Sequence, residues 1–491
     1  MNKSSVISTA ALLAWGLVGF SSRAQETVAP ATAASTESAT NSTSEPATPP
    51  AANSKVRIVR LSEVKGEVQL DRLTGKGLEA AMANLPVIEG SRLKTGNGVA
   101  EVEFEDNSTV RLAPNSLVEF PRLELLPGGI KASTVDVQQG MVYVSLVNTK
   151  DNQLSVKFGQ QTMNLPPDSH IRLQVTPTEA NLAVMHGDVT VEEPAGTTNI
   201  GKNKTATFNL TGQGQPTIAK SLTDQPLDKW DSTAVQYHKS YANASAFGGS
   251  PYAYGINDMN YYGSFVSGCG GSLWRPYFTG AAWDPYSSGA WAYYPSAGYS
   301  WVSPYPWGWT PYHYGSWSFC QGIGWGWMPG GAWMGLANNS FVNPNGSPNS
   351  FAGTRPHPPV ARPSVTQSSL VGVNLKAMPA STLNGEDKFV FRSDSAGLGV
   401  PRGTLGKLNG FSNHVAEHGM ASTTVFTSSA GGARAGGQEP STFSAANRGN
   451  PGSASTRSSS SSNMQGPGGG GSSHMSAPSA AGPSGGGGGR R

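Results

Sequence analysis

Charged side chains are scarce in this chain. Only 13% of its 491 residues are Asp, Glu, Lys or Arg, whereas Gly and Pro number 62 and 35. The formal net charge is +3, and no stripe of basic residues stands out. Because nucleic-acid binding needs clustered Lys and Arg that neutralise phosphates, we expect no nucleic-acid partner. Low charge and many small residues favour an exported envelope protein over a cytosolic enzyme.

Motifs of the common catalytic and metal sites are also missing from the sequence. The eight histidines are scattered, and His414 and His418, which have helical spacing, lack the glutamate of a zinc-hydrolase motif. No glycine-rich phosphate loop joins a strand to a helix, and no nucleophile elbow occurs. We therefore predict a non-catalytic protein with no catalytic residue, no cofactor and no metal.

Long apolar runs are limited to the amino terminus. Lys3 supplies a positive start, residues 6–20 are apolar, and small residues flank Arg23. This pattern predicts a secretory signal peptide at 1–24. A membrane anchor is the less favoured interpretation, because the apolar run is shorter than the roughly 20 residues that a membrane-spanning helix needs. We expect an exported protein of the periplasm or cell surface, or an extracellular one, with no transmembrane helix in the mature chain.

Cysteine occurs twice, as Cys269 and Cys320. In an exported chain the pair predicts one disulfide that closes a loop of about 50 residues. A catalytic cysteine paired with His313 is the alternative, but the local sequence resembles no nucleophile motif.

Composition divides the rest of the chain into ordered and flexible segments. Stretches rich in Ala, Thr, Ser, Pro or Gly cannot bury enough apolar surface to offset their ordering entropy. The predicted segments are a disordered Ala/Thr/Pro linker at 25–54, a β domain at 55–211, a connector at 212–250, an aromatic repeat domain at 251–340, a Pro-rich linker at 341–369, a weakly ordered segment at 370–429 and a disordered Gly/Ser-rich tail at 430–491. The connector holds a candidate helix at 227–245 that Asp224 would cap, and the weakly ordered segment is expected to dock on the aromatic domain.

Residues 55–211 alternate apolar and polar side chains between glycine turns, which predicts many short strands. We expect a β-sandwich or β-roll with one core, and a helical turn at 78–83 as its only departure. Glu101, Glu103 and Glu105 share one face of a hairpin, which predicts a solvated face, with a Ca²⁺ site as the alternative.

Several phrases in this region resemble a known family. They are Gly-Glu-Val at 66–68, the turn at 88–96, the hairpin at 98–112 (Gly-Val-Ala-Glu-Val-Glu-Phe-Glu-Asp-Asn-Ser-Thr-Val-Arg-Leu), Asn-Ser at 115–116, the strand at 140–144 and the closing strand pair at 186–191. Together they are similar to a FecR domain. Ser91 stands where the family's turn usually has Asp, and Asn107 where its hairpin usually has Gly; both residues suit turns.

The resemblance implies an exported β domain that contacts other envelope components. Well-known FecR proteins receive a signal from an outer-membrane receptor and pass it through a membrane helix to a cytoplasmic anti-sigma segment. This sequence shows neither a second membrane helix nor such a segment, which argues against transmembrane signalling by this chain alone.

Ten of the twelve tryptophans lie between residues 274 and 333 at a near-constant stride. Eight of them are spaced 8 to 10 residues apart: Trp274, Trp283, Trp291, Trp301, Trp309, Trp317, Trp325 and Trp333. With Gly and Pro between them, they predict short strands and tight turns that bring indole rings together. Phrases at 309–317 and 324–329 are similar to a domain of uncharacterised function that often follows FecR domains.

Two interpretations of this ladder stay open. The indoles form the core of a block that has few Leu, Ile or Val, or some of them form an exposed glycan-binding face. The candidate ligand-binding residues are Trp301, Trp307, Trp309, Tyr312, Trp317, Trp325 and Trp327. The predicted function is binding or scaffolding at the cell surface through envelope proteins or cell-wall and surface polysaccharide. The alternatives are a sensory component that acts with a separate membrane regulator and, more weakly, a glycan-active enzyme that uses Asp258 or Asp284.

Overall fold

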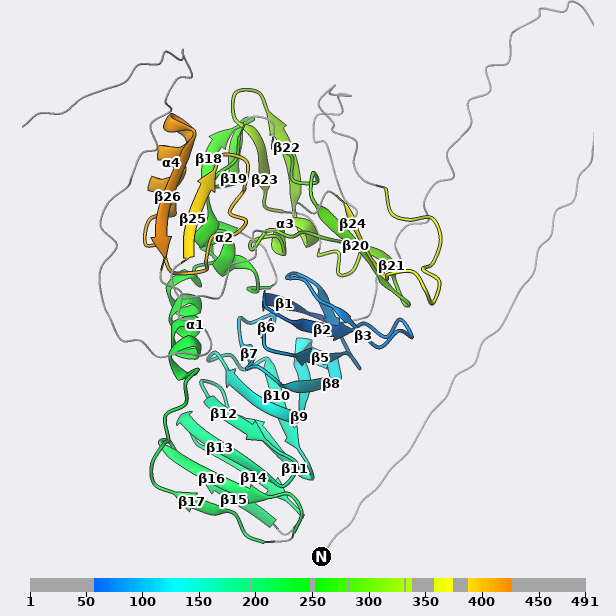
Figure 1. Ribbon diagram of the computed structural model, residues 1–491, viewed down its shortest axis with the longest axis vertical. Helices are drawn as coiled ribbons and strands as arrows, with labels where there is room; N and C mark the ends of the chain where they lie inside the picture. The colour runs from blue at the N-terminus through cyan, green and yellow to red at the C-terminus, as the bar shows by residue number, and fades with distance from the viewer. Residues whose placement is uncertain are drawn as a thin grey trace, which may run out of the picture. The chain divides into compact units, whose positions relative to one another are not determined.

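The computed structural model describes residues 57–194, 196–212, 214–247, 252–280, 283–330, 333–337, 357–373 and 387–425. The predicted signal peptide, the linker at 25–54 and the tail at 430–491 lie outside these ranges. Strand is the predominant regular structure of the described residues and far exceeds helix, which confirms the predicted, mostly β fold class (Figure 1). Among them, no helix combines the length and the apolar character needed to cross a bilayer.

The first half folds as two mainly antiparallel sheets that share one long strand. That strand is β9 (Lys131–Ser145). The first sheet also contains β1 (Ile58–Lys65), β4 (Pro86–Ile88), β6 (Val99–Glu103), β7 (Thr109–Leu112), β12 (His170–Val175), β13 (Glu179–His186), β16 (Lys204–Asn209) and β17 (Thr217–Ala219). The second sheet contains β2 (Val68–Asp71), β3 (Leu78–Ala80), β5 (Arg92–Thr95), β8 (Leu117–Leu125), β10 (Asn152–Phe158), β11 (Gln161–Leu165), β14 (Val189–Glu193) and β15 (Gly196–Ile200). A 3₁₀ turn, η1 (Pro127–Gly129), links β8 to β9.

Strand β9 changes sheet at Gly140. Its first part pairs with β8 and, in parallel, with β10, while its last six residues pair with β7 and β12. Gly140 has φ +91°, and a Cβ at this position would lie 2.4 Å from Ser116 Oγ. Only glycine adopts this backbone conformation and permits this approach without strain. The bend therefore folds one continuous ribbon into two layers.

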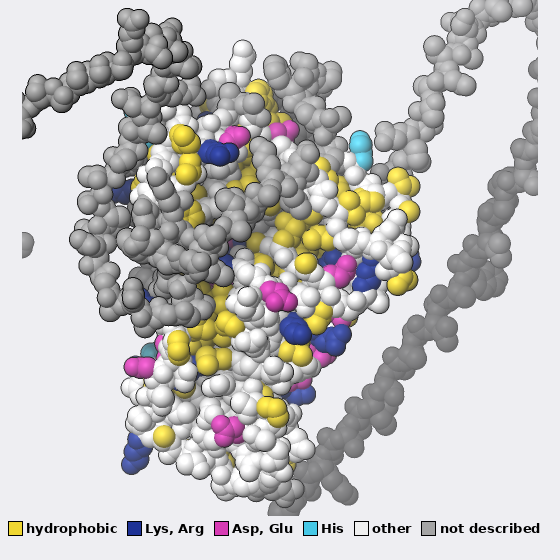
Figure 2. Space-filling view, in the orientation of Figure 1, with side chains coloured by type: hydrophobic (Ala, Val, Ile, Leu, Met, Phe, Trp, Pro, Cys, Tyr) yellow, Lys and Arg dark blue, Asp and Glu magenta, His cyan; other side chains and the backbone are white. Residues whose placement is uncertain are grey.

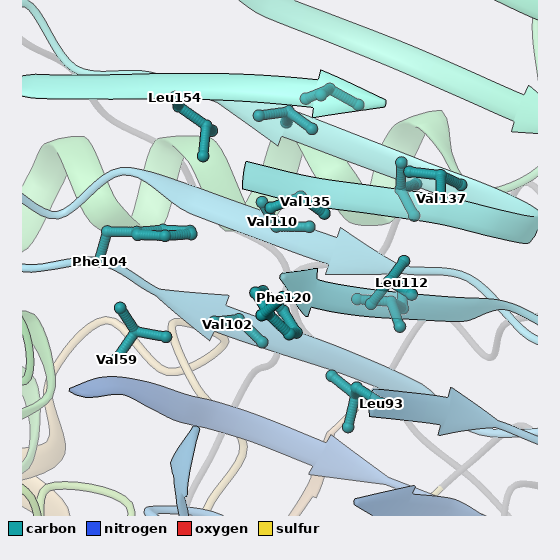
Figure 3. Packing of buried hydrophobic residues seen from close by; sticks show 14 of the residues in the cluster. Val59, Leu93, Val102, Phe104, Val110, Leu112, Phe120, Val135, Val137 and Leu154 are labelled. Atoms are coloured by element: carbon teal, nitrogen blue, oxygen red, sulfur yellow. The ribbon is translucent and has the colours of Figure 1, made fainter. Parts of the chain in front are cut away.

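A single apolar core fills the space between the two layers. Figure 3 shows Val102 and Val110 from the first sheet facing Phe120, Val135 and Val137 from the second, and all five are fully buried. The apolar residues of the alternating strands thus face the core between the sheets, as the sequence pattern predicted. The helical turn expected at 78–83 is wrong, because Leu78–Ala80 pairs with β2 as strand β3.

The second half is built from short elements. Its strands are β18 (Gly263–Gly268), β19 (Gly271–Pro276), β20 (Gly289–Tyr294), β21 (Gly298–Val302), β22 (Ser316–Cys320), β23 (Gly324–Met328), β24 (Leu370–Val373), β25 (Asp387–Arg392) and β26 (Met420–Val425). They form sheets in the orders β18-β19-β23-β22, β21-β20-β24 and β25-β26. The helical elements are α1 (Asp228–Tyr241), η2 (Ser245–Phe247), α2 (Ile256–Tyr262), α3 (Thr310–His313) and α4 (Leu408–His418).

Helix α1 is the helix predicted in the connector, although its cap differs. Leu227, and not Asp224, stands at the N-cap, and no side chain caps the helix; the Asp228 carboxylate of the first turn accepts a hydrogen bond from the backbone N–H of Gln225 (2.8 Å). Within the segment at 370–429, the described residues 370–373 and 387–425 dock on the aromatic half as expected. Strand β24 pairs with β20, and the Trp307 indole donates to the Ala396 carbonyl (2.7 Å).

The predicted solvated face of β6 is wrong. Glu101 and Glu103 are 0% exposed and Glu105 is 5% exposed, because the second half of the chain covers this face of the sheet. Charged side chains therefore line a buried interface between the two halves, and each needs a partner.

Candidate functional site

The seven aromatic residues proposed as a ligand-binding face all lie inside the protein. Their exposed fractions range from 0% for Trp307, Trp309 and Trp327 to 7% for Trp325. Tyr312 and Trp301 are 2% exposed. Of the two interpretations of the ladder, the burial favours the indole core.

The rings also do not share one face. Trp307, Tyr312 and Trp317 form one cluster, in which Trp307 stacks on Tyr305 with a centroid distance of 4.9 Å. Trp301 packs on Trp291, at 5.2 Å. The remaining three lie elsewhere: Trp309 against His313, Trp325 against Phe319, and Trp327 against Tyr314.

Some indole N–H groups of the aromatic half find acceptors inside the protein, whereas the buried N–H groups of Trp291 and Trp317 have none in the described part of the chain. Trp274 donates to the Met259 carbonyl (3.0 Å), and Trp327 donates to the Tyr314 carbonyl (2.8 Å). Buried indoles need such acceptors, because a polar group without one costs free energy in a dry core. Burial lowers the pKa of His313 to about 4, so this ring is neutral at pH 7. The aromatic half is thus a packed core rich in internal hydrogen bonds.

A disulfide joins Cys269 to Cys320, with the Cα atoms 5.7 Å apart. It links the β18–β19 turn to the end of β22 and closes the loop predicted from the sequence. Cys320 is bonded, and His313 lies in the aromatic core with its Nδ1 facing the Gly335 carbonyl (2.5 Å). The two residues therefore do not form the catalytic pair considered as an alternative.

The densest gathering of ionisable groups lies between the two halves. We call it the interface network. It consists of Arg60, Glu101, Glu103, Arg111, Tyr143, His170 and Arg172 from the first half, and Asp228, Asp231, Tyr237, His238, Asp258 and Arg402 from the second. Five carboxylates thus face four guanidinium groups and two imidazoles.

Helix α1 brings three members of the interface network to the sheet. Asp228 accepts hydrogen bonds from Arg172 (2.6 Å) and the Tyr143 hydroxyl (2.9 Å). Asp231, three residues later, pairs with Arg111 (2.6 Å). His238 follows at the spacing of two further turns and contacts Glu101 (3.0 Å). The helix therefore meets the sheet with a charged stripe along one face.

Glu101 is the centre of the network on the side of the first half. Arg111 (2.9 Å), Arg402 (2.7 Å) and His238 (3.0 Å) all contact its carboxylate, and the Ser62 hydroxyl donates to it (2.7 Å). Burial by itself raises the pKa of Glu101, but the positive charges around it outweigh burial and hold that pKa well below its ordinary value. Glu101 is thus ionised and multiply bonded.

Asp258 of α2 is the matching centre on the side of the second half. Arg402 binds it through two nitrogens, at 2.8 and 2.6 Å, while Arg60 lies 2.7 Å away and the Tyr237 hydroxyl donates to it (2.7 Å). Burial opposes its charge, but Arg402 and Arg60 lower the pKa of Asp258 below the ordinary value. Arg402 therefore bridges the two centres, because it contacts Glu101 and Asp258 at once.

Glu103 behaves in the opposite way. Burial raises its pKa, and the pairing with Arg60 (2.9 Å) offsets only part of that rise. Its other oxygen accepts a hydrogen bond from the backbone N–H of Gly255 (3.0 Å). The glutamate thus also holds the chain at the start of α2.

Solvent does not reach the centre of the network. Arg60, Glu101, Glu103 and Asp258 are all 0% exposed, so a dissolved substrate has no access to their charges. The second carboxylate considered for glycan hydrolysis, Asp284, lies in its own turn and accepts a hydrogen bond from the backbone N–H of Tyr286 (2.7 Å). The ion pairs and hydrogen bonds of the interface network therefore hold the first half of the chain against the second half.

The sequence did carry a signal for this network. Arg60 lies opposite Glu103 and Glu101 lies opposite Arg111 on neighbouring strands, and Asp228 and Asp231 have helical i, i+3 spacing. Opposite charges in cross-strand positions, together with a helix that has an acidic stripe, indicate a covered charged face. Arg402 lies about 300 residues from Glu101 and had no such local signal.

Comparison with known proteins agrees with the division into two halves. Residues 91–197 match the family model described as FecR protein, and residues 256–356 match the Family of unknown function (DUF6600). No curated protein matches the chain. Two crystal structures of a putative anti-sigma factor from Parabacteroides distasonis ATCC 8503 are similar at 14% and 12% identity. The matches cover 28% and 38% of this chain and 63% and 98% of those chains, each with a TM-score of 0.24.

Proposed function

We propose that this chain, in which a FecR domain is combined with a DUF6600 domain, is a non-catalytic exported protein that works by binding other envelope proteins. The interface network carries the proposal. It joins the two domains through buried ion pairs, which supports partners that meet both domains together instead of two tethered modules. The sequence supports export through its signal-peptide pattern and its paired cysteines.

The ionisable side chains pair with one another in the interior, and this pairing supports a non-catalytic role. Carboxylates, guanidiniums and imidazoles gather in the interface network, where each faces an opposite charge or a hydrogen-bonding partner. Catalytic acids and bases need access to substrate, and the centre of this cluster has none. Burial of the tryptophan ladder likewise makes protein partners a better match than polysaccharide.

Affinity capture from intact envelope tests the proposal. The full chain is expressed with a carboxyl-terminal tag in its own cells, cross-linked in place and recovered with its neighbours, and purified peptidoglycan and surface polysaccharide are tested for retention in parallel. We expect defined protein partners in the envelope fraction and no retention on either glycan. Recovery of the tagged chain in the cytosol, or glycan retention without protein partners, would contradict the proposal.

A second candidate is a sensory role beside a separate membrane regulator. The FecR match at 91–197 favours it, because signalling members of that family contain the same domain. Under this proposal, deletion of the gene changes transcription of a small set of genes that depend on one alternative sigma factor. An unchanged transcriptome would exclude the sensory role and leave the binding role in place.

A further inference from the structure

Strand β15 forms an open edge of the second sheet, at the lower end of the first half in Figure 1. It pairs with β14 on one side, and no other described strand pairs with it. In an antiparallel pair every second residue directs its N–H and C=O away from the neighbouring strand. Among the described residues, no backbone group outside β14 bonds to residues 196–200. The outer edge of β15 therefore presents unpaired backbone donors and acceptors.

This edge lacks the features that usually keep a sheet from adding another strand. Natural edge strands are protected by lysine, by proline, by a bulge or by being very short. Strand β15 reads Gly-Thr-Thr-Asn-Ile, and its register with β14 runs without a shift over all five residues. By contrast, β17, the edge strand of the first sheet, has three residues and directly follows Pro216. Figure 2 shows mainly uncharged polar side chains and backbone on the visible side of this end.

The shape of β15 fits an antiparallel pairing with β15 of a second copy. Paired residues of antiparallel strands point to the same face of the sheet, and only a pairing centred on Thr198 uses all five residues. This pairing sets Ile200 of each copy opposite Gly196 of the other. Ile200 is buried, and nothing lies within 4 Å of a Cβ built on Gly196. The larger side chain thus meets the smallest one, and the two strands approach without a clash.

The outward-facing row of the second sheet also continues across this pairing. Ser155, Asn164, Thr190 and Asn199 lie in register on β10, β11, β14 and β15. Ser155 donates to the Asn164 side chain (2.5 Å), and Thr190 donates to the Asn199 side chain (2.5 Å). Asn199 ends the row and uses its carbonyl oxygen in that bond, so its amide nitrogen is left for a further acceptor. In the pairing centred on Thr198, the hydroxyl of Thr197 from the second copy stands opposite this nitrogen.

Charges beyond the two ends of β15 are complementary in the same pairing. Glu192 and Glu193 precede the strand, whereas Lys202 and Lys204 follow it. None of these four side chains forms an ion pair within the described part of the chain. Asp188 lies near Lys204, so the second end keeps an excess of one positive charge. A two-fold axis brings the acidic end of each copy to the basic end of the other, which favours a second copy over an unrelated strand.

We propose that the full chain forms a two-fold symmetric dimer in which the β15 strands of the two copies pair antiparallel and centred on Thr198. The second sheet then runs through both copies and loses its open edge at β15. Because five residues make a short edge, the interface is small and the dimer dissociates on dilution. The dimer needs no envelope partner, so this inference goes beyond the proposed binding role.

Sedimentation equilibrium of the purified full chain over a concentration series tests the dimer. We expect a monomer–dimer equilibrium for the natural sequence. The double variant Thr197→Lys with Asn199→Lys sets lysine opposite lysine at two places, which should weaken dimerisation about tenfold. The double variant Thr197→Lys with Asn199→Asp sets lysine opposite aspartate at the same two places. Its dimerisation should stay within about threefold of the natural chain.

A matched pair of changes on the other edge strand serves as the control. Thr217 and Ala219 are exposed on β17, and replacement of both by lysine should change dimerisation less than about twofold. Circular dichroism of each variant checks that the fold is kept. A natural chain that stays monomeric at its highest soluble concentration overturns the proposal. A dimer that responds equally to the Lys/Lys and Lys/Asp changes, or that the β17 changes also weaken tenfold, overturns it as well. Each of these results leaves the binding of envelope proteins untouched, because capture from the envelope tests that role separately.

Discussion

Replacement of Arg402 by alanine is the sharpest test of the interface network. In the folded protein this side chain is 12% exposed and makes three short contacts to two carboxylates. It also lies over the ring of Tyr237, with the guanidinium carbon 5.1 Å from the ring centroid. Loss of the side chain leaves Glu101 with Arg111 and His238, and leaves Asp258 with Arg60 and Tyr237.

The expected cost follows from those remaining partners. Removal of one member of a buried ion pair costs about 3–5 kcal/mol when its partner is left alone. Because both carboxylates keep other partners, we expect a value near the lower end, about 3 kcal/mol. The comparison is Arg122→Ala, which removes an ion pair whose side chains are 48% and 51% exposed. That exposed pair contributes about 0–1 kcal/mol.

Urea unfolding followed by tryptophan fluorescence measures the difference. The ten tryptophans between 274 and 333 report on the second half, and circular dichroism reports on the β-sheets of the first. We expect Arg402→Ala to shift the fluorescence midpoint strongly and Arg122→Ala to leave it almost unchanged. If the two variants lost the same free energy within about 0.5 kcal/mol, the ionic account of the interface would be refuted.

Three further predictions concern pH, the disulfide and glycine packing. His238, Arg402 and Arg111 lower the folded-state pKa of Glu101 despite burial, and Arg402 and Arg60 lower that of Asp258. The stabilisation from these carboxylates is therefore complete above the unfolded carboxyl pKa of about 4 and is lost as pH falls from there through the lowered folded-state values. Urea midpoints measured from pH 7 to pH 3 should drop below about pH 4, and a flat profile would contradict the pairing. Replacement of Cys320 by serine opens a loop with a sequence separation of 51, which should cost about 4 kcal/mol on the chain-entropy estimate, and an unchanged melting temperature of the non-reduced protein would refute it. In the β18–β19 hairpin, a Cβ at Gly263 would lie 2.4 Å from the Trp274 ring, whereas nothing lies within 4 Å of one at Gly271; Gly263→Ala should therefore cost about 1–3 kcal/mol and Gly271→Ala close to none, as measured by thermal unfolding.

The β-architecture was predictable because its evidence is local. Alternation along residues 99–104 and 109–112 specifies a hairpin with one apolar face, and glycine marks the turns between strands. Strand β9 was harder, because its bend at Gly140 looks like an ordinary turn between two strands until the pairing partners are known. The sequence therefore indicates strands well and their division between two sheets poorly.

The interface network was missed for a physical reason. A charged residue that alternates with apolar ones has the same pattern whether water or another layer of protein covers it. Glu101 is buried only because His238 and Arg402 arrive from distant segments. For the aromatic ladder the sequence left two interpretations open, a core or an exposed glycan-binding face, and only the burial of the rings in the structure favours the core.

The contact between Trp307 and Ala396 bears on how this protein can be divided into recombinant fragments. The DUF6600 match ends at residue 356, yet the acceptor for this buried indole comes 40 residues later, from the chain after that boundary. A fragment trimmed to the match would strand the Trp307 N–H in a dry interior and remove the aromatic ring of Phe391 that stacks on Phe278 (5.3 Å). Recombinant fragments of the second half should consequently extend to Val425 at least. They should also include the first sheet of the first half, because Arg60 on its strand β1 pairs with Asp258.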